Sequence, residues 1–255
     1  MVSFDQMPKV APLRRAFDAA VDAVVAPALG RRHFIVFRDY PIAYGRVPKV
    51  ANTSIKDALT RLLPDGEALR RKASHDRVWA YETCGRTRMV RTASAARLDG
   101  VFAFAFVRDP FERVASYYDN KVIGRPILPD IARRDGVRKG MGFGAFLERL
   151  AVMKDGDMDD HLAPQAEILV HRGRLVPSFV GRYERIEDDW AALQARLEAI
   201  GVPALGPLPT RNRRAPDGHP MEAYFADPAH VRMVRERYAQ DFELFYPDAE
   251  PCRPA

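Results

Sequence analysis

The chain has 255 residues, of which 47% are hydrophobic and 29% charged, so it can bury one good-sized core and has the composition of a globular enzyme. No apolar run approaches the roughly 20 residues of a membrane-spanning helix, and residues 1–9 lack the apolar core of a secretory signal. Cys84 and Cys252 have neither metal-binding spacing nor the number that a disulfide framework needs. We therefore expect a single domain over 1–255, located in a reducing cytoplasm.

Basic residues outnumber acidic ones and give a formal net charge of +6, and arginine supplies most of them. Arginine binds phosphate and sulfate through two parallel hydrogen bonds, although a GC-rich genome would also favour arginine over lysine. Of the few lysines, Lys49 and Lys56 fall inside one short segment. That segment is therefore a candidate site.

The first part of the chain contains two predicted helices and, between them, a short predicted strand. Apolar positions recur at helical spacing over 11–27, which predicts an N-terminal helix. A short buried strand is expected at 33–37 and a loop over 45–53. A helix is predicted over 54–63, because Pro64 would stop it.

The middle of the chain contains the clearest strand. Residues 75–98 are ambiguous: 78–81 could form a strand, and 86–98 is predicted to be helical. The run VFAFAFV at 101–107 is apolar throughout, as in a central strand covered on both faces. A helix is expected over about 110–122, because a proline suits its first turn.

The remaining elements continue the same alternation. They are a mobile loop over 124–142, a helix over 143–153, a strand at 178–183, a helix over 187–200, an extended loop over 201–220 and a last helix over about 228–245. Strands that alternate with helices predict an α/β fold with a central parallel sheet flanked by helices.

The segment VPKVANTSIK at 47–56 is a candidate phosphate-binding loop, since it follows the first predicted strand and opens a helix. Backbone N–H groups at a helix N-terminus are unpaired, and the helix dipole favours an anion there. Asn52, Thr53 and Ser54 add small hydrogen-bonding side chains, and Lys49 adds a positive charge. A plain capped helix is the alternative interpretation.

The loop departs from the Walker A motif. From Gly45, that motif requires a glycine at position 50 and a lysine at 51, where Val50 and Ala51 stand, and no Ser or Thr follows a lysine to hold Mg²⁺. This disfavours the second hypothesis, a P-loop nucleotide kinase or other phosphoryl transferase. A nucleic-acid-binding module is also disfavoured, because the arginines are spread along the chain and no aromatic RNA-binding motif is present.

The segment RDPFERVASYY begins where the buried strand turns into a helix, which is the ligand-binding edge of an open α/β sheet. Arg108 is expected to point at the crevice, and Ser116, two turns into the helix, to face the same pocket. Arg113 lies on another face and could brace the loop through Asp109 or Glu112. A surface ion-pair cluster is the alternative interpretation.

Together, these two segments resemble the 5′-phosphosulfate loop and the 3′-phosphate motif of sulfotransferases. The stretch HLAPQ at 161–165 resembles an H-x-x-P-Q stretch of the carbohydrate sulfotransferase branch (chondroitin and HNK-1 type and bacterial relatives), and 180–189 resembles its later strand-to-helix segment. The resemblance covers about 33–245 in the family's order. The chain departs from the Golgi enzymes in lacking a membrane anchor and their cysteine-rich C-terminal portion.

The resemblance implies a P-loop-like three-layer α/β domain that transfers a sulfuryl group from 3′-phosphoadenosine-5′-phosphosulfate to an acceptor hydroxyl. The acceptor is expected to be a sugar or glycolipid rather than a nucleic acid, and the oligomeric state stays open. No metal is expected, because a sulfuryl group carries less negative charge than a phosphoryl group. Lys49 would neutralise the bridging oxygen as the sulfuryl group leaves. The donor-binding residues implied are Pro48, Lys49, Asn52, Thr53, Ser54, Arg108, Ser116 and Arg213.

The acceptor hydroxyl needs a general base, and histidine suits that task near neutral pH. His161 lies in the H-x-x-P-Q stretch, with aspartates just before it at 157–160. His75 lies between the two donor motifs, and Glu82 follows a possible strand. The sequence leaves all three as candidates, with His161 and His75 the preferred pair.

Overall fold

The computed structural model describes residues 32–124, 127–128, 130–155, 158–209 and 220–248. The predicted helix over 11–27 and the candidate Arg213 lie outside the described residues. Among the described residues, no helix is long and apolar enough to cross a membrane.

A five-stranded sheet is the centre of the fold, in the strand order β3-β1-β2-β4-β7. Strands β2, β4 and β7 are parallel to one another, whereas β1 is antiparallel to both β2 and β3. The α/β fold with a largely parallel sheet is thus confirmed, with β1 as the exception. The strands are β1 (Phe34–Phe37), β2 (Ile42–Gly45), β3 (Thr87–Val90), β4 (Phe102–Val107) and β7 (Phe179–Arg182).

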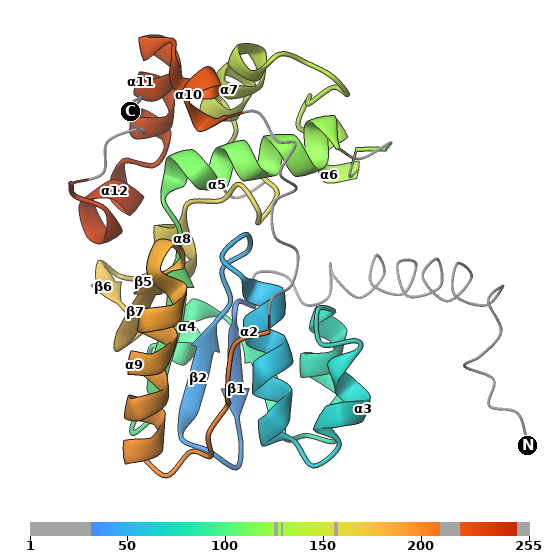
Figure 1. The fold of residues 1–255 in the computed structure, drawn as a ribbon, viewed down its shortest axis with the longest axis vertical. Helices are drawn as coiled ribbons and strands as arrows, with labels where there is room; N and C mark the ends of the chain where they lie inside the picture. The colour runs from blue at the N-terminus through green and yellow to red at the C-terminus, as the bar shows by residue number, and fades with distance from the viewer. Residues whose placement is uncertain (1–31, 125–126, 129, 156–157, 210–219, 249–255) are drawn as a thin grey trace, which may run out of the picture.

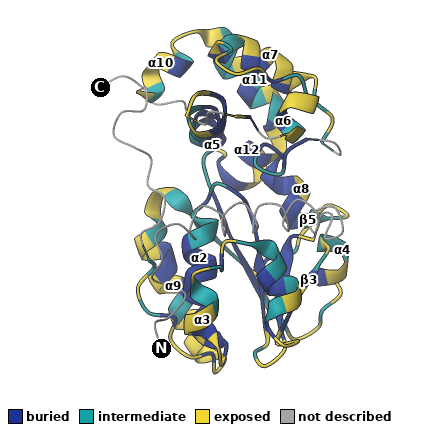
Figure 2. Ribbon diagram, turned by 90° about the vertical axis from the view of Figure 1, so that its right-hand side faces the viewer, coloured by how far each residue is buried: buried dark blue, intermediate teal, exposed yellow. Residues whose placement is uncertain are grey.

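Helices cover the sheet and form a separate group above it. Helices α2, α3 and α9 lie on one face of the sheet and α4 on the other, while α5, α7, α10 and α11 lie beyond one end of the strands (Figures 1 and 2). The longer helices are α2 (Asn52–Leu59), α5 (Pro110–Tyr117), α7 (Phe143–Ala151), α9 (Ile186–Ala199), α11 (Pro228–Arg237) and α12 (Ala239–Phe245). The shorter ones are α3 (Gly66–Arg70), α4 (Thr92–Ala95), α6 (Asp130–Arg134), α8 (Gln165–Leu169) and α10 (Met221–Phe225). A small hairpin pairs β5 (Val170–His171) with β6 (Arg174–Leu175).

The strands predicted at 33–37, 101–107 and 178–183 are confirmed, and so are the helices predicted over 143–153 and 187–200. The helix predicted over 54–63 begins two residues earlier, and its last turn is 3₁₀ (Thr60–Leu62). The helix predicted over 110–122 is α5 continued by a π-helical turn, Tyr118–Ile123. The last predicted helix is two helices that break at Tyr238, and the predicted loop over 124–142 contains α6.

Two predictions in the region 75–98 are wrong. Residues Val78–Glu82 form a π-helical turn rather than a strand. Residues 86–98 are not one helix, because Thr87–Val90 pairs with β1 as an edge strand and only α4 is helical. The conformation of this short segment is determined by its pairing with a strand that is distant in sequence. Local hydrophobic periodicity cannot predict such a pairing.

The ends of the parallel strands define the edge where ligands bind in open α/β sheets. Gly45 of β2 pairs beside Ala105, and Val107 of β4 pairs beside Arg182 of β7. The two motif segments leave the sheet at this edge. The phosphate-binding segment therefore follows β2, a strand that the sequence did not predict, and not the first strand.

Candidate functional site

The loop between β2 and α2 has an unusual backbone. Lys49 and Ala51 have φ angles of 72° and 60°, although neither is glycine. Left-handed backbone is costly for residues with a Cβ, and it is retained mainly at functional sites. No side chain caps the first turn of α2, so its backbone N–H groups are available to an anion. Asn52, in that turn, accepts a 3.1 Å hydrogen bond from the Tyr44 hydroxyl.

Lys49 lies close enough to three other basic side chains for their charges to affect its pKa. Burial, followed by the charges of Arg108, Lys121 and Arg113, lowers the pKa of Lys49 to about 7. Arg113 and Lys121 are buried, at 1% and 8% exposure. The charge of Asp119 opposes this effect but is outweighed by burial and the three cations, so the surroundings of Lys49 favour an anionic ligand.

Arg108 follows β4 directly and is held at several points. Its Nη2 and Nε lie 3.0 and 3.2 Å from Oε2 of Glu112, and the guanidinium stacks 4.4 Å above the ring of Tyr183. Ser116 is partly exposed and lies one turn beyond Glu112 on α5, so it shares that helix face. That Arg108 and Ser116 serve one pocket stays a prediction.

Arg113 does not pair with Asp109 or Glu112 as one prediction had it. Asp109 instead caps α5, because its side chain accepts the N–H of Phe111 at 2.7 Å. The Arg113 guanidinium donates to three backbone carbonyls, those of Pro48, Ala163 and Asp160, at 3.3, 2.8 and 3.2 Å. It thereby joins the loop between β2 and α2 to the segment that contains His161.

His161 forms a close pair with an aspartate. Its Nδ1 lies 2.6 Å from Oδ1 of Asp159, whose Oδ2 accepts a 3.2 Å hydrogen bond from Tyr117. Burial acts to raise the pKa of Asp159, but hydrogen bonds and charge from His161, with the charge of Lys121, outweigh it and hold that pKa well below its usual range. The imidazole remains accessible, with 39% of its side chain exposed. This combination of an oriented ring and an open face suits a general base.

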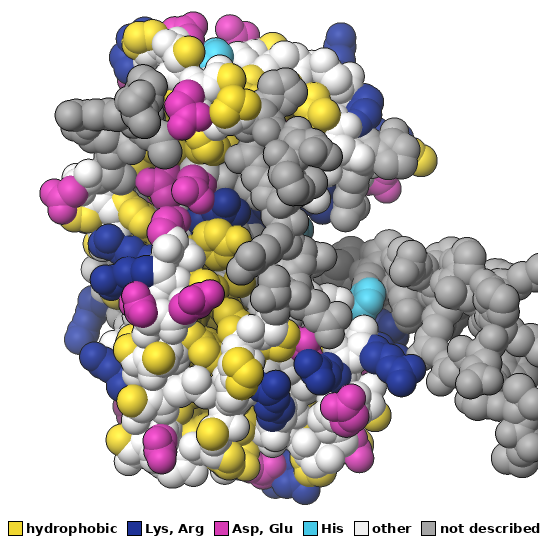
Figure 3. All heavy atoms as spheres, viewed as in Figure 1, with side chains coloured by type: hydrophobic (Ala, Val, Ile, Leu, Met, Phe, Trp, Pro, Cys, Tyr) yellow, Lys and Arg dark blue, Asp and Glu magenta, His cyan; other side chains and the backbone are white. Residues whose placement is uncertain are grey.

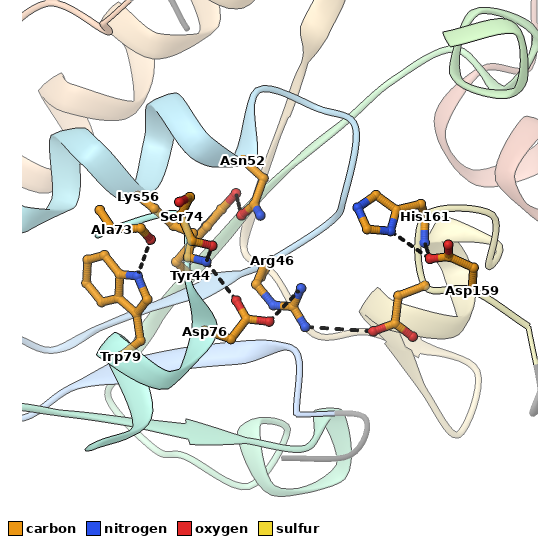
Figure 4. A network of polar contacts seen from close by, with 11 residues as sticks. Tyr44, Arg46, Asn52, Lys56, Ala73, Ser74, Asp76, Trp79, Asp159 and His161 are labelled. Atoms are coloured by element: carbon orange, nitrogen blue, oxygen red, sulfur yellow. Dashed lines mark hydrogen bonds and ion pairs between the residues drawn. The ribbon is translucent and has the colours of Figure 1, made fainter. Parts of the chain in front are cut away.

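A network of ion pairs connects the region of the β2–α2 loop with the chain segments of both candidate histidines (Figure 4). Arg46, the first residue after β2, lies 3.2 Å from Asp76 and 3.8 Å from Asp160. Asp76 also pairs at 2.7 Å with the buried ammonium of Lys56. Burial opposes ionisation of Asp76, but the charges of Lys56 and Arg46 prevail and lower its pKa to about 2.

The two other candidate bases, His75 and Glu82, have different surroundings. His75 is the chain neighbour of Asp76 and so lies next to this network, which keeps it a candidate. Glu82 is engaged by two cations, Arg77 at 3.0 Å and Lys72 at 3.5 Å. Both partners lie in the same stretch of chain as Glu82, so these ion pairs do not connect it to the loop between β2 and α2.

Sequence reasoning missed Arg46 and the bridging role of Arg113, because both act through partners that are distant along the chain. In the part of the chain that the structure describes, no group of three or more His, Cys, Asp or Glu residues is placed to hold a metal ion.

The sequence profile of the sulfotransferase family matches residues 32–247. The chain is 30% identical over 241 residues to carbohydrate sulfotransferase 14 of Homo sapiens, covering 85% of this chain and 60% of that protein. It is 28% identical over 246 residues to carbohydrate sulfotransferase 10 of Danio rerio, with coverages of 82% and 64%. The chain thus spans about three fifths of the length of these relatives. No solved structure matches the chain. A family profile that covers most of the chain shows that this chain belongs to the sulfotransferase family.

Proposed function

We propose that this protein transfers a sulfuryl group from 3′-phosphoadenosine-5′-phosphosulfate to a hydroxyl of a carbohydrate or glycoconjugate. The observation that carries the proposal is the basic cluster around Lys49, at the edge where the β2–α2 loop and Arg108 meet. The family profile and the names of the similar carbohydrate sulfotransferases support the reaction type and the acceptor class.

The two motifs divide the donor between them in this proposal. The loop from Pro48 to Ser54 would hold the 5′-phosphosulfate with backbone N–H groups and the side chains of Asn52, Thr53 and Ser54. Arg108 and Ser116 would hold the 3′-phosphate, which ATP and AMP lack.

The transfer is an in-line displacement. The acceptor oxygen forms a bond to sulfur while the bond from sulfur to the bridging phosphate oxygen breaks, and Lys49 stabilises the charge that develops on that oxygen. His161 takes the proton of the acceptor hydroxyl; its Nδ1 is engaged by Asp159, which leaves Nε2 for the proton. No step needs a metal ion, and a metal-free reaction remains a prediction.

The kinase alternative lacks support in the site. Val50 and Ala51 replace the Walker A residues, and the family profile is that of sulfotransferases. A nucleic-acid-binding role is disfavoured by the surface, where Lys and Arg side chains are scattered among acidic and apolar ones on the visible face (Figure 3). A cytoplasmic location remains part of the proposal and is tested by cell fractionation.

The direct test is donor-dependent sulfation. A cell extract is incubated with the protein and donor labelled in its sulfate, and the labelled product is identified by mass spectrometry. We expect labelled carbohydrate with wild type and labelling at least about 10²-fold slower with Lys49→Ala. Magnesium-dependent ATP turnover without any sulfated product would instead support the kinase.

A further inference from the structure

Gln165 is fully buried at 0% exposure, and its side-chain amide is bound to the backbone of Arg108. Its Oε1 accepts the Arg108 N–H at 2.9 Å, and its Nε2 donates to the Arg108 carbonyl at 2.8 Å. The last ladder pair of β4 and β7 is Val107 beside Arg182. The amide of Gln165 therefore satisfies both backbone groups of the first residue after the paired part of β4.

A buried carboxylate holds Gln165 in turn. Asp241 of α12 accepts the backbone N–H groups of Gln165 and Ala166 at 2.9 and 2.7 Å, and the Gln165 side-chain amide at 3.3 Å. Asp241 is 0% exposed. The position of Gln165 is thus fixed from the C-terminal helix, which leaves its amide no freedom to follow Arg108.

We propose that Gln165 is a positioning residue for the 3′-phosphate site: it fixes the backbone of Arg108 so that the guanidinium meets that phosphate. Glu112 and Tyr183 orient only the guanidinium end of the side chain, whereas Gln165 fixes where the side chain begins. This inference rests on the proposed function, since it assigns a task within the donor site.

The same segment also contributes the proposed base. His161 lies four residues before Gln165. Arg113 donates to the carbonyls of Asp160 and Ala163 in this segment, and so connects the segment to the donor loop. A displacement of Gln165 would therefore change the position of Arg108 directly. It would reach His161 only indirectly, through the intervening residues of the segment.

The test compares dissociation constants for adenosine 3′,5′-bisphosphate and AMP in wild type and Gln165→Met, measured by titration calorimetry. Methionine is similar in length but cannot form either hydrogen bond strongly. We expect the variant to weaken bisphosphate binding by about tenfold and AMP binding by less than about twofold, since two backbone hydrogen bonds at Arg108 are lost. In an Arg108→Ala background, Gln165→Met should have little further effect on bisphosphate binding.

Thr87→Val is the matched control. Its hydroxyl donates a buried 2.6 Å hydrogen bond to the Trp79 carbonyl, and β3 lies at the opposite edge of the sheet from β7. This variant should lower Tm without changing the ratio of the two dissociation constants. A folded Gln165→Met protein that keeps the wild-type ratio overturns the inference.

Amide hydrogen exchange of the wild type decides the matter if Gln165→Met does not fold. The Arg108 amide should exchange as slowly as those of β4, and rapid exchange would contradict the inference. If the wild type binds both nucleotides equally, the proposed function is contradicted, and this inference falls with it. If the wild type discriminates between them and Gln165→Met keeps the same ratio, only this inference is contradicted.

Discussion

Lys49 is the residue on which the proposed chemistry depends most. Lys49→Ala should lower kcat by about 10²–10³-fold, the usual cost of losing a group that stabilises transition-state charge, and should weaken adenosine 3′,5′-bisphosphate binding far less. Steady-state kinetics and calorimetry measure the two effects. Lys154→Ala, at an exposed lysine, is the control. Turnover of Lys49→Ala within a few-fold of wild type would remove Lys49 from the mechanism.

The pH dependence of Lys49 follows from its environment. Burial and neighbouring cations lower its pKa to about 7, so the free enzyme loses this charge as pH rises through 7. We expect kcat/KM for the donor to fall above that pH. In Lys49→Arg this fall should be absent, because arginine stays charged, and a wild-type profile that is flat from pH 6 to 9 would contradict the assignment.

The pair of His161 and Asp159 makes a separate prediction. His161→Ala should lower kcat by on the order of 10²-fold, remove the acidic limb of the pH–rate profile and leave bisphosphate binding intact. The same profile for His75→Ala and Glu82→Ala provides the comparison. If His161→Ala keeps the limb and another variant loses it, that other residue is the base.

At the scale of elements, the loop that precedes α2 is held in a strained conformation. Ala51 has a φ of 60°, which glycine adopts without cost. Ala51→Gly should therefore raise Tm of the free protein by a few degrees, since about 1 kcal/mol of strain is relieved. Ala51→Val should lower it, because a β-branched side chain tolerates this region least. Scanning calorimetry measures both, and equal Tm values for the three proteins would show that the backbone there is not left-handed.

The sequence placed both motifs correctly at strand-to-helix junctions, whereas pairings across the chain could not be predicted. Each motif lies within about ten residues at the β2–α2 or β4–α5 junction, and the donor-binding roles of its residues stay predictions. Strands β2 and β3 were missed because four residues carry little periodicity, and their identity comes from pairing with β1. The contacts of Gln165 join residues 57 and 76 positions apart, which no local pattern contains.

At the scale of the whole molecule, the buried ion network makes stability depend on acid. The pKa of Asp76 is about 2 in the folded protein, below the value of about 3.9 in an unfolded chain. The ionised carboxylate of Asp76 therefore stabilises the folded protein fully above about pH 4. The free energy of unfolding should fall by about 1–2 kcal/mol as pH falls toward 2. Urea unfolding at pH 5, 4, 3 and 2 measures it.

Asp76→Asn should lower stability at neutral pH, because Lys56 would stay buried without its partner carboxylate. The variant should also show a shallower loss of stability between pH 4 and 2 than wild type. Parallel curves for the two proteins would contradict the role given to Asp76.

The central claim is that this site binds an adenylate donor through its 3′-phosphate. The most direct measurement is the shift in Tm with saturating adenosine 3′,5′-bisphosphate compared with AMP. A ligand that binds only the folded state at about 100 times its Kd stabilises it by about 2.7 kcal/mol, which is several degrees for a chain of this size. The account predicts that shift with the bisphosphate, a much smaller one with AMP, and loss of the difference in Arg108→Ala. Equal shifts with both nucleotides in the wild type would contradict it.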